Sequence, residues 1–198
     1  VPWSDRIAMD AALDAGDLRA ADKLAAAWGR AAASEPLRAL RLGRLARYEG
    51  RLDEADALTR VAVERGTVTP RVLWERVLVL VARDHASEVA ALLARYPLVL
   101  GPLATWLSAY ATASSGKAES ILAAKGMTAT LDPPPDTAPF EVRMVAATAL
   151  GAMRDKKRGR DYVRALLETG SVEPDLATAA LSLGFRAVAR GTRRVRYE

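Results

Sequence analysis

The residue types that support catalysis or metal binding are few in this sequence, and they do not form a working set. Histidine occurs once, at His85 beside Asp84 between two predicted helices, where we expect an exposed loop side chain rather than a general base. The chain contains no cysteine, which excludes disulfides and thiolate metal sites. The carboxylates show no clustering at the spacing of a metal site. We therefore predict no catalytic residue, no metal and no cofactor, and we expect that the protein is not an enzyme.

One short motif and two acidic pairs contain residue types that occur in chemical sites. Residues 114–117 read Ser-Ser-Gly-Lys, which resembles the end of a phosphate loop, but the upstream glycine, the following Ser/Thr and a preceding strand are missing. Asp53 with Glu54, and Asp14 with Asp17, lie at predicted turns and helix starts. There they compensate the helix dipole, which explains them without catalysis.

Positive charge is concentrated at the C-terminal end of the chain. Residues 141–198 contain 12 Lys or Arg and 7 Asp or Glu, whereas residues 1–140 contain 17 of each. A basic patch surrounds one predicted turn between helices and comprises Arg154, Lys156, Lys157, Arg158, Arg160 and Arg164. Such a patch can attract nucleic acid, anionic lipid or an acidic protein surface. A solvated turn followed by a disordered basic tail explains the same charges without any partner.

Two features of composition weaken a nucleic-acid role for this patch. The chain has no asparagine and no glutamine, whose amides are the usual bidentate readers of adenine. No row of aromatic residues accompanies the basic side chains, so a platform for stacking single-stranded bases is missing as well.

Evenly spaced prolines indicate the elements that must position these residues. The first three follow each other at 34 residues and the later ones at 32, 37 and 35, as seen at Pro2, Pro36, Pro70, Pro102, Pro139 and Pro174. A 34-residue period is the length of a helix-turn-helix unit. Proline is tolerated in the first turn of a helix, where its missing N–H is not needed. The sequence therefore predicts a row of helix pairs.

Two further markers keep the same period. Fourteen residues after the first three prolines stand Gly16, Gly50 and Asp84, where a left-handed residue would end a helix of about four turns. The second helix of each pair then carries a small residue and a leucine on one face, at Ala21 with Leu24, Ala55 with Leu58, and Val89 with Leu92. Their agreement indicates true repeats.

The predicted helices are divided by one proline-rich interruption. We expect helices over residues 4–15, 17–32, 34–50, 51–66, from 70, 87–96, from 102, 117–125, 140–153, 159–168 and 174–190. The helix from Pro70 is apolar almost all round and should be the most buried. We divide the chain into helical repeats at 1–126, a linker at 127–139, and a divergent pair, capping helix and basic tail at 140–198. The linker's three consecutive prolines suit a rigid spacer, or a docking motif for a proline-binding module.

The second predicted unit resembles the tetratricopeptide repeat. The resemblance lies in Leu42-Gly43, Ala46, the turn residue Gly50 and Glu54-Ala55. The first unit matches through Gly16-Asp17-Leu18 and Ala20-Ala21 but has Met9 in place of the helix glycine, and the third keeps Glu88 and Leu92 but has Arg76-Val77 and Asp84. The resemblance covers about residues 2–100. It implies an all-α fold: a right-handed α-solenoid of antiparallel helix pairs, closed by a C-terminal capping helix.

In this family the first helices of the pairs line a concave groove that binds a peptide or a helix of another protein. The resemblance implies that the residues at the groove-facing positions are Trp3, Arg6, Asp10, Leu40, Arg44, Arg47, Tyr48, Trp74 and Leu78. Trp, Tyr and Arg often dominate binding energy, so the expected partner segment is acidic and apolar. The asparagine with which some members clamp a terminal carboxylate is missing, although Arg44 and Arg47 remain to hold one. Trp74 and Leu78 suit a core position equally well.

These observations predict a non-catalytic protein-interaction scaffold or assembly factor. The alternative is a helical-repeat adaptor that binds nucleic acid or an anionic surface through the basic patch, and a weaker one is a ligand-sensing solenoid of a larger regulator. The abundance of Ala and Arg is typical of a GC-rich bacterial genome, which suggests the bacterial cytoplasm or cell envelope.

No apolar stretch is long enough to span a membrane. The start at Val1 fits a trimmed leader or anchor, and equally a shortened chain.

Overall fold

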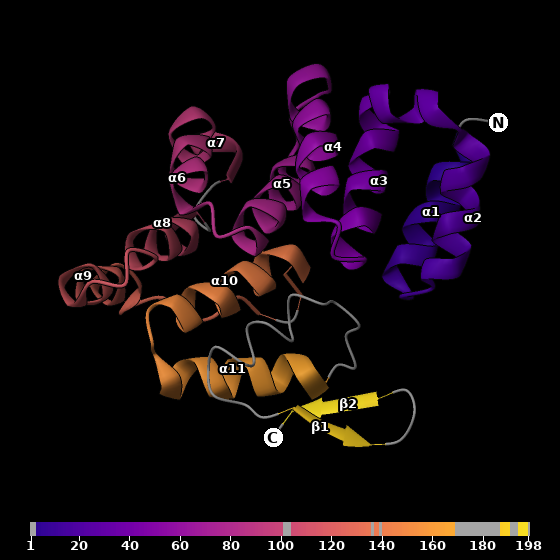
Figure 1. Ribbon diagram of the computed structural model, residues 1–198. Coiled ribbons are helices and arrows are strands. Elements are labelled where there is room, and N and C mark those ends of the chain that lie inside the picture. The colour runs from indigo at the N-terminus through magenta and orange to yellow at the C-terminus, as the bar shows by residue number, and fades with distance from the viewer. Residues whose placement is uncertain are drawn as a thin grey trace. The chain divides into compact units, whose positions relative to one another are not determined.

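The computed structural model describes residues 3–100, 104–135, 137–138, 140–168, 187–190 and 194–197 (Figure 1). The chain divides into two compact units, Val1–Arg83 and Asp84–Glu198, and each is described by itself. Most of the described residues are helical, which confirms the predicted all-α class apart from one small hairpin near the C-terminus.

The first unit is built from helices whose starts follow the predicted signals. Its elements are α1 (Ser4–Asp14), α2 (Leu18–Trp28), the 3-10 turn η1 (Arg30–Ser34), α3 (Pro36–Tyr48), α4 (Leu52–Arg65) and α5 (Pro70–Ala82). Proline stands in the first turn of α3 and α5, as predicted. The side chains before them cap these helices, since Glu35 accepts from the N–H of Leu37 at 3.2 Å and Thr69 from that of Val72 at 3.3 Å.

The predicted left-handed turns are confirmed. The three residues concerned have positive φ angles of 68°, 75° and 57°, at Gly16, Gly50 and Asp84. At the second of these turns the N–H of Gly50 donates to the carbonyl of Arg47 at 3.0 Å, and the N–H of Arg51 donates to that of Ala46 at 2.8 Å. This pair of bonds is the Schellman motif, which satisfies the last carbonyls of α3. The chain is thereby turned back toward α4.

The same turn recurs in the second unit, where the sequence showed only an approximate proline period. Gly116, fourteen residues after Pro102, has φ 71°, and Arg154, fifteen after Pro139, has φ 53°. The N–H of Arg154 donates to Gly151 O at 2.9 Å and that of Asp155 to Leu150 O at 3.0 Å. The helix-pair turn therefore extends beyond the region of sequence resemblance.

Replacing Gly50 by alanine is expected to lower the free energy of unfolding by about 1 kcal/mol, because a Cβ is strained at positive φ although no atom lies within 4 Å of it. The matched change Gly126→Ala lies inside a helix, in equally open space, and should instead stabilise by about 0.5–1 kcal/mol. Denaturant titration of both variants measures the difference. Equal effects at the two positions would contradict the left-handed turn at Gly50.

Gly43 allows α3 and α4 to pack closely. A Cβ at this position would lie 2.8 Å from Cγ2 of Thr59 and 3.4 Å from Cβ of Leu58, both on α4. The Leu42-Gly43 pair singled out in the sequence is thus the place where the two helices of this pair approach each other.

Two apolar clusters hold the first unit together. In one, Met9 and Leu13 of α1 pack with Ala21 of α2 and Leu45 of α3. In the other, Ala46 of α3 packs with Ala55 of α4 and Val79 of α5. Each helix pair is therefore joined to the next by an apolar residue of the following first helix. The helix from Pro70 is buried almost all round, as predicted: every residue from Val72 to Leu80 is buried.

The second unit contains further helix pairs and the hairpin. Its elements are α6 (Ala86–Arg95), α7 (Pro97–Leu100), α8 (Ala104–Ala113), α9 (Ala118–Thr128), α10 (Phe140–Ala152), α11 (Lys156–Glu168), β1 (Ala187–Arg190) and β2 (Arg194–Tyr197). Helix α8 packs against α6, α9 and α10, and α10 packs against α11. The two strands pair antiparallel, with Ala187 opposite Tyr197.

Several predicted helix limits were wrong. The second helix ends at Trp28 rather than Ala32, because Gly29 has φ 69° and breaks it before η1. Helix α9 continues past Gly126 to Thr128, since a single helical glycine costs only about 1 kcal/mol. The interruption thus begins at Ala129 rather than at 127.

The predicted capping helix over 174–190 was wrong at its end. Residues 187–190 form β1, and the remainder of that predicted helix lies outside the described residues. The β-branched and aromatic side chains of Val188, Val195 and Tyr197 favour strands. In residues 194–197, Val195 and Tyr197 alternate with arginines, which is the two-residue period of a strand. Helix α11 also begins earlier than predicted, at Lys156, so the basic patch lies largely within its first turns.

Candidate functional site

Ion pairs link the first helices of the first unit, α1, α3 and α5. The bonded atoms are Arg41 Nη2 and Asp10 Oδ2 at 2.6 Å, Arg44 Nη1 and Asp14 Oδ1 at 2.7 Å, Arg71 Nη2 and Asp10 Oδ1 at 3.0 Å, and Arg47 Nε and Glu75 Oε1 at 2.8 Å. We call these residues the charged stripe. The stripe arises from helical spacing, since residues three or four apart share one face of a helix.

Two of the predicted groove arginines, Arg44 and Arg47, belong to this stripe and lie in the interior. Arg47 is 2% exposed, and its guanidinium also donates from Nη2 to Glu75 at 3.4 Å. Arg44 is 8% exposed and donates to the hydroxyl of Tyr48 from Nε at 3.0 Å and Nη2 at 2.7 Å. Both guanidinium groups stack on the Tyr48 ring. A partner carboxylate would reach Arg47 only by displacing Glu75.

The other predicted groove residues divide into buried and accessible ones. Leu40, Trp74 and Leu78 are buried. Asp10 is half-buried within the charged stripe. Trp3 is 66% exposed, and the Arg6 guanidinium stacks on its ring at 4.7 Å from the centroid. The accessible part of the predicted groove is therefore centred on α1.

An exposed apolar face on α1 was not recognised in the sequence. Beside Trp3 it presents Ile7, also 66% exposed, together with the exposed Ala8 and Ala11. We call these four residues the α1 face. The spacing of Trp3, Ile7 and Ala11 at four residues is the signal that could have identified it.

The 34-residue period shows what the equivalent positions do elsewhere. Ala11 corresponds to Leu45 in α3 and to Val79 in α5. Leu45 is buried against Met9 and other residues of the first pair, and Val79 is buried against the second pair. The equivalent place on α1 is exposed.

A second charged cluster centres on Asp56 of α4, and sequence reasoning missed it. Its carboxylate lies 2.6 Å from Arg76 Nη1, 2.7 Å from Arg60 Nη2 and 3.1 Å from Arg83 Nη1. Burial acts to raise the pKa of Asp56, but the hydrogen bond from Arg76 and the charges of Arg76, Arg60 and Arg83 outweigh it and lower that pKa below its usual value. These contacts join α4 to α5.

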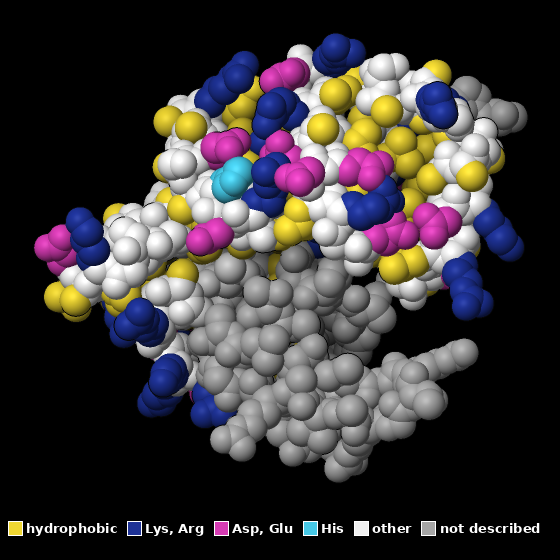
Figure 2. Space-filling view, viewed as in Figure 1, with side chains coloured by type: hydrophobic (Ala, Val, Ile, Leu, Met, Phe, Trp, Pro, Cys, Tyr) yellow, Lys and Arg dark blue, Asp and Glu magenta, His cyan; other side chains and the backbone are white. Residues whose placement is uncertain are grey.

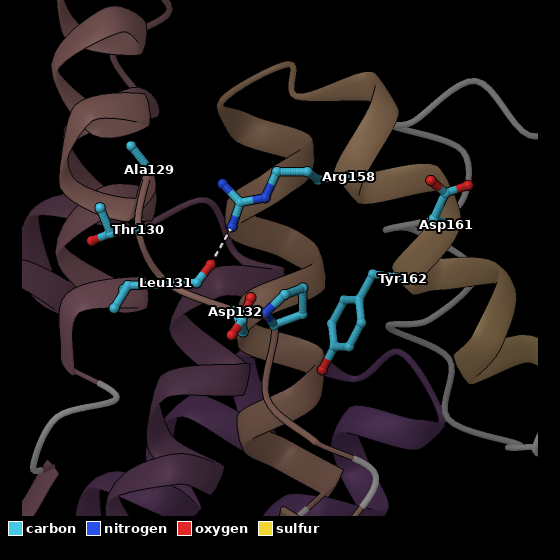
Figure 3. Close-up of a pocket in the computed structure, with 8 residues that line it drawn as sticks. Ala129, Thr130, Leu131, Asp132, Arg158, Asp161 and Tyr162 are labelled. Carbon is cyan, nitrogen blue, oxygen red and sulfur yellow. Dashed lines mark hydrogen bonds between the residues drawn. The ribbon is translucent and has the colours of Figure 1, made fainter.

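A pocket of about 390 Å³ lies in the second unit between the proline-rich segment and α11 (Figure 3). It is lined by Ala129, Thr130, Leu131, Asp132, Pro133, Arg158, Asp161 and Tyr162. Arg158 donates from Nη2 to Leu131 O at 2.7 Å and from Nη1 to Thr128 O at 3.1 Å, and Tyr162 donates to Pro134 O at 3.4 Å. These bonds hold the segment against α11, which favours the spacer interpretation over a docking motif.

The basic patch is therefore divided by the structure. Arg158 is half-buried and points toward the proline-rich segment (Figure 3). The other five side chains are exposed: Arg154, Lys156, Lys157, Arg160 and Arg164. Arg164 lies 3.7 Å from Asp161. The accessible cations thus gather at the turn before α11 and along its first turns.

The single histidine of the sequence, His85, faces one carboxylate. His85 Nδ1 lies 2.9 Å from Glu88 Oε1 at the start of α6. Among the described residues, no three or more His, Cys, Asp or Glu side chains are grouped so that they could hold a metal. Figure 2 shows acidic and basic side chains interspersed over the coloured part of the visible face, with the histidine among them. Within the described part of the chain, each helix is too short or too polar to cross a membrane.

Comparison with known proteins found no similarity on which a function could be based. The sequence matches no protein-family model. Neither a curated protein nor a solved structure matches it significantly.

Proposed function

We propose that this protein is a non-catalytic protein-interaction module, a tetratricopeptide-like solenoid of helix pairs in a right-handed superhelix that binds a helix of another protein. The observation that carries the proposal is the repeated left-handed turn within the helix pairs, at Gly16, Gly50, Asp84 and Gly116. Repeats of this kind stack through neighbours and leave long surfaces for binding. Proteins built in this way commonly serve as scaffolds.

The α1 face is the surface that suits a partner helix best. At the positions of α3 and α5 that are equivalent to Ala11, Leu45 and Val79 pack on a preceding helix pair. On α1 the small side chains of Ala8 and Ala11 leave room for a helix to approach, and Trp3 and Ile7 flank them. Large aromatic side chains of this kind often become the centre of a binding interface.

The charged stripe has a supporting role in this proposal. Its arginines are bonded to carboxylates of neighbouring helices, so they hold the first helices in register instead of contacting the partner. The expected partner helix therefore presents apolar side chains to the α1 face, and Arg44 and Arg47 are not required to bind its charges.

Replacing Trp3 and Ile7 by serine should weaken partner binding at least about tenfold, because two exposed apolar anchors are lost. A photo-crosslinking residue placed at Ile7 identifies the partner, and titration of the purified partner measures its affinity for both forms. The matched control is Leu122→Ser, which removes an equally exposed leucine from the second unit. Unchanged affinity after the double replacement, with loss after Arg44→Ala, would instead support the predicted groove.

A further inference from the structure

We propose that the second unit binds anionic lipid bilayers through a surface formed by the outer side of α9 and the start of α11. We define this lipid-facing surface by Leu122, Met127, Arg154, Lys156 and Lys157. The proposal is independent of the α1 face, which belongs to the first unit.

The outer side of α9 is apolar and uncovered. Leu122 is 72% exposed and Met127 is 44% exposed, two of the few large hydrophobic side chains that stand in solvent. Ala123 and Gly126 lie between them on the same side of the helix and are exposed too, and no atom lies within 4 Å of a Cβ built at Gly126. The opposite side, with Ala124 and Thr128, is buried. One side of α9 is thus packed against the protein, and the other side exposes apolar side chains to solvent.

The fold brings this apolar ridge next to the exposed cations. Arg158 of α11 donates to the carbonyl of Thr128, the last residue of α9, at 3.1 Å. Its guanidinium also stacks 5.7 Å from the ring centre of Trp106, on the neighbouring helix α8. The end of α9 and the first turn of α11 are therefore joined. In Figure 2 the apolar side chains of α9 and the basic ones at the start of α11 follow each other along the left edge.

The charges at the start of α11 do not serve the stability of the helix. A positive first turn opposes the helix dipole. In three other second helices the first turn is acidic, with Asp53 and Glu54 in α4, Glu88 in α6 and Glu119 in α9, whereas α2 and α11 have no acidic residue there. The acids close by are engaged with their own helix, because Asp155 lies 3.7 Å from Arg158 and Asp161 lies 3.7 Å from Arg164. A net positive surface remains beside the apolar ridge.

This combination suits a bilayer better than a nucleic acid. A phosphate backbone uses cations alone and gives Leu122 and Met127 nothing to contact. Trp106, on which Arg158 stacks, and Tyr162 of α11 are buried and cannot stack on bases. At a membrane surface, cations meet anionic headgroups while apolar side chains enter the boundary with the acyl chains. Both halves of the surface then have a partner.

Vesicle co-sedimentation of the full chain tests the proposal. We expect binding to phosphatidylcholine vesicles that contain phosphatidylserine, weakened by added salt, and no binding to phosphatidylcholine alone. Lys156→Gln with Lys157→Gln should reduce affinity about 25-fold, at about fivefold per charge. Leu122→Ser with Met127→Ser should reduce it about tenfold or more. Circular dichroism confirms that each variant is folded.

The matched control neutralises two exposed arginines of the first unit, Arg19→Gln with Arg30→Gln, and should bind as the unaltered chain. Lack of binding to the anionic vesicles, or equal losses in the control, would overturn the proposal. So would a serine variant that binds vesicles normally while the glutamine variant loses binding to both vesicles and duplex DNA, since that pattern assigns the patch to nucleic acid.

Discussion

Replacing Glu75 by alanine should destabilise the first unit by about 3–5 kcal/mol, because the buried guanidinium of Arg47 loses its carboxylate. The side chains of this pair are only 1% and 4% exposed, so water cannot take the place of the lost partner. Denaturant unfolding, followed by tryptophan fluorescence, measures the loss.

Two matched variants decide whether burial is the cause. Glu54→Ala removes one of the two carboxylates that Arg51 contacts, the other being Glu49. The side chains of Arg51 and Glu54 are 45% and 53% exposed, so this loss should cost less than about 1 kcal/mol. The double replacement Arg47→Met with Glu75→Leu removes both charges and should recover most of the stability. A loss at Glu75 no larger than that at Glu54 would contradict the buried pair.

The same double variant separates two roles for Arg47. If Arg47 holds the helices in register, the Met/Leu variant should fold and still bind the partner of the α1 face. If Arg47 holds a carboxylate of the partner, as the sequence resemblance implies, the variant should fold and lose that binding.

The second large effect is expected for Asp56, whose replacement by asparagine should cost about 3 kcal/mol at neutral pH. The change leaves Arg76 buried beside a neutral amide, while Arg60 and Arg83 lose the shared carboxylate. The size of the loss distinguishes this residue from Asp22, which is exposed on α2 and whose replacement by asparagine should have little effect.

The effect of Asp56 should also depend on pH in a defined direction. Its pKa is lowered in the folded protein, so the unfolded chain takes up the proton first as the pH falls. The stabilisation is therefore complete above the ordinary aspartate pKa, about 3.9, and is lost as the pH falls through that value toward the lower folded pKa. Unfolding titrations between neutral and acid pH should show the free energies of unfolding of the unaltered protein and the Asp56→Asn variant converging as the pH falls. A constant difference down to low pH would show that Asp56 acts through its shape and not its charge.

The turns were predictable because their cause is local. A left-handed residue is favourable only for a few side chains, so Gly16 and Gly50 identify their positions directly, and Asp84 is recognised from the period. The helix starts at Pro36 and Pro70 follow from the same kind of restriction. Glycines within or beside helices were harder to interpret. The predicted helix limits were wrong by a few residues at Gly29, which ends its helix, and at Gly126, which does not.

Pairs formed between distant helices could not be assigned from the sequence. Arg47 meets Glu75 across 28 residues, and nothing in the neighbourhood of either residue indicates the other. The 34-residue period could have reduced the number of candidate partners for Arg47. It relates Ala11, Leu45 and Val79, and so indicates which face of each first helix meets the preceding pair.

The sequence by itself determined the helical class, the places where the chain turns and the uneven charge, because these depend on the conformation and the charge of individual residues. The tertiary structure alone decided which side chains remain available for binding. Arg44, Arg47 and Arg158 look accessible in the sequence, but each is bonded to groups far along the chain. Trp3 and Leu122 stand in solvent because no described helix covers them. Exposure is a property of the packed helices, which no single segment contains.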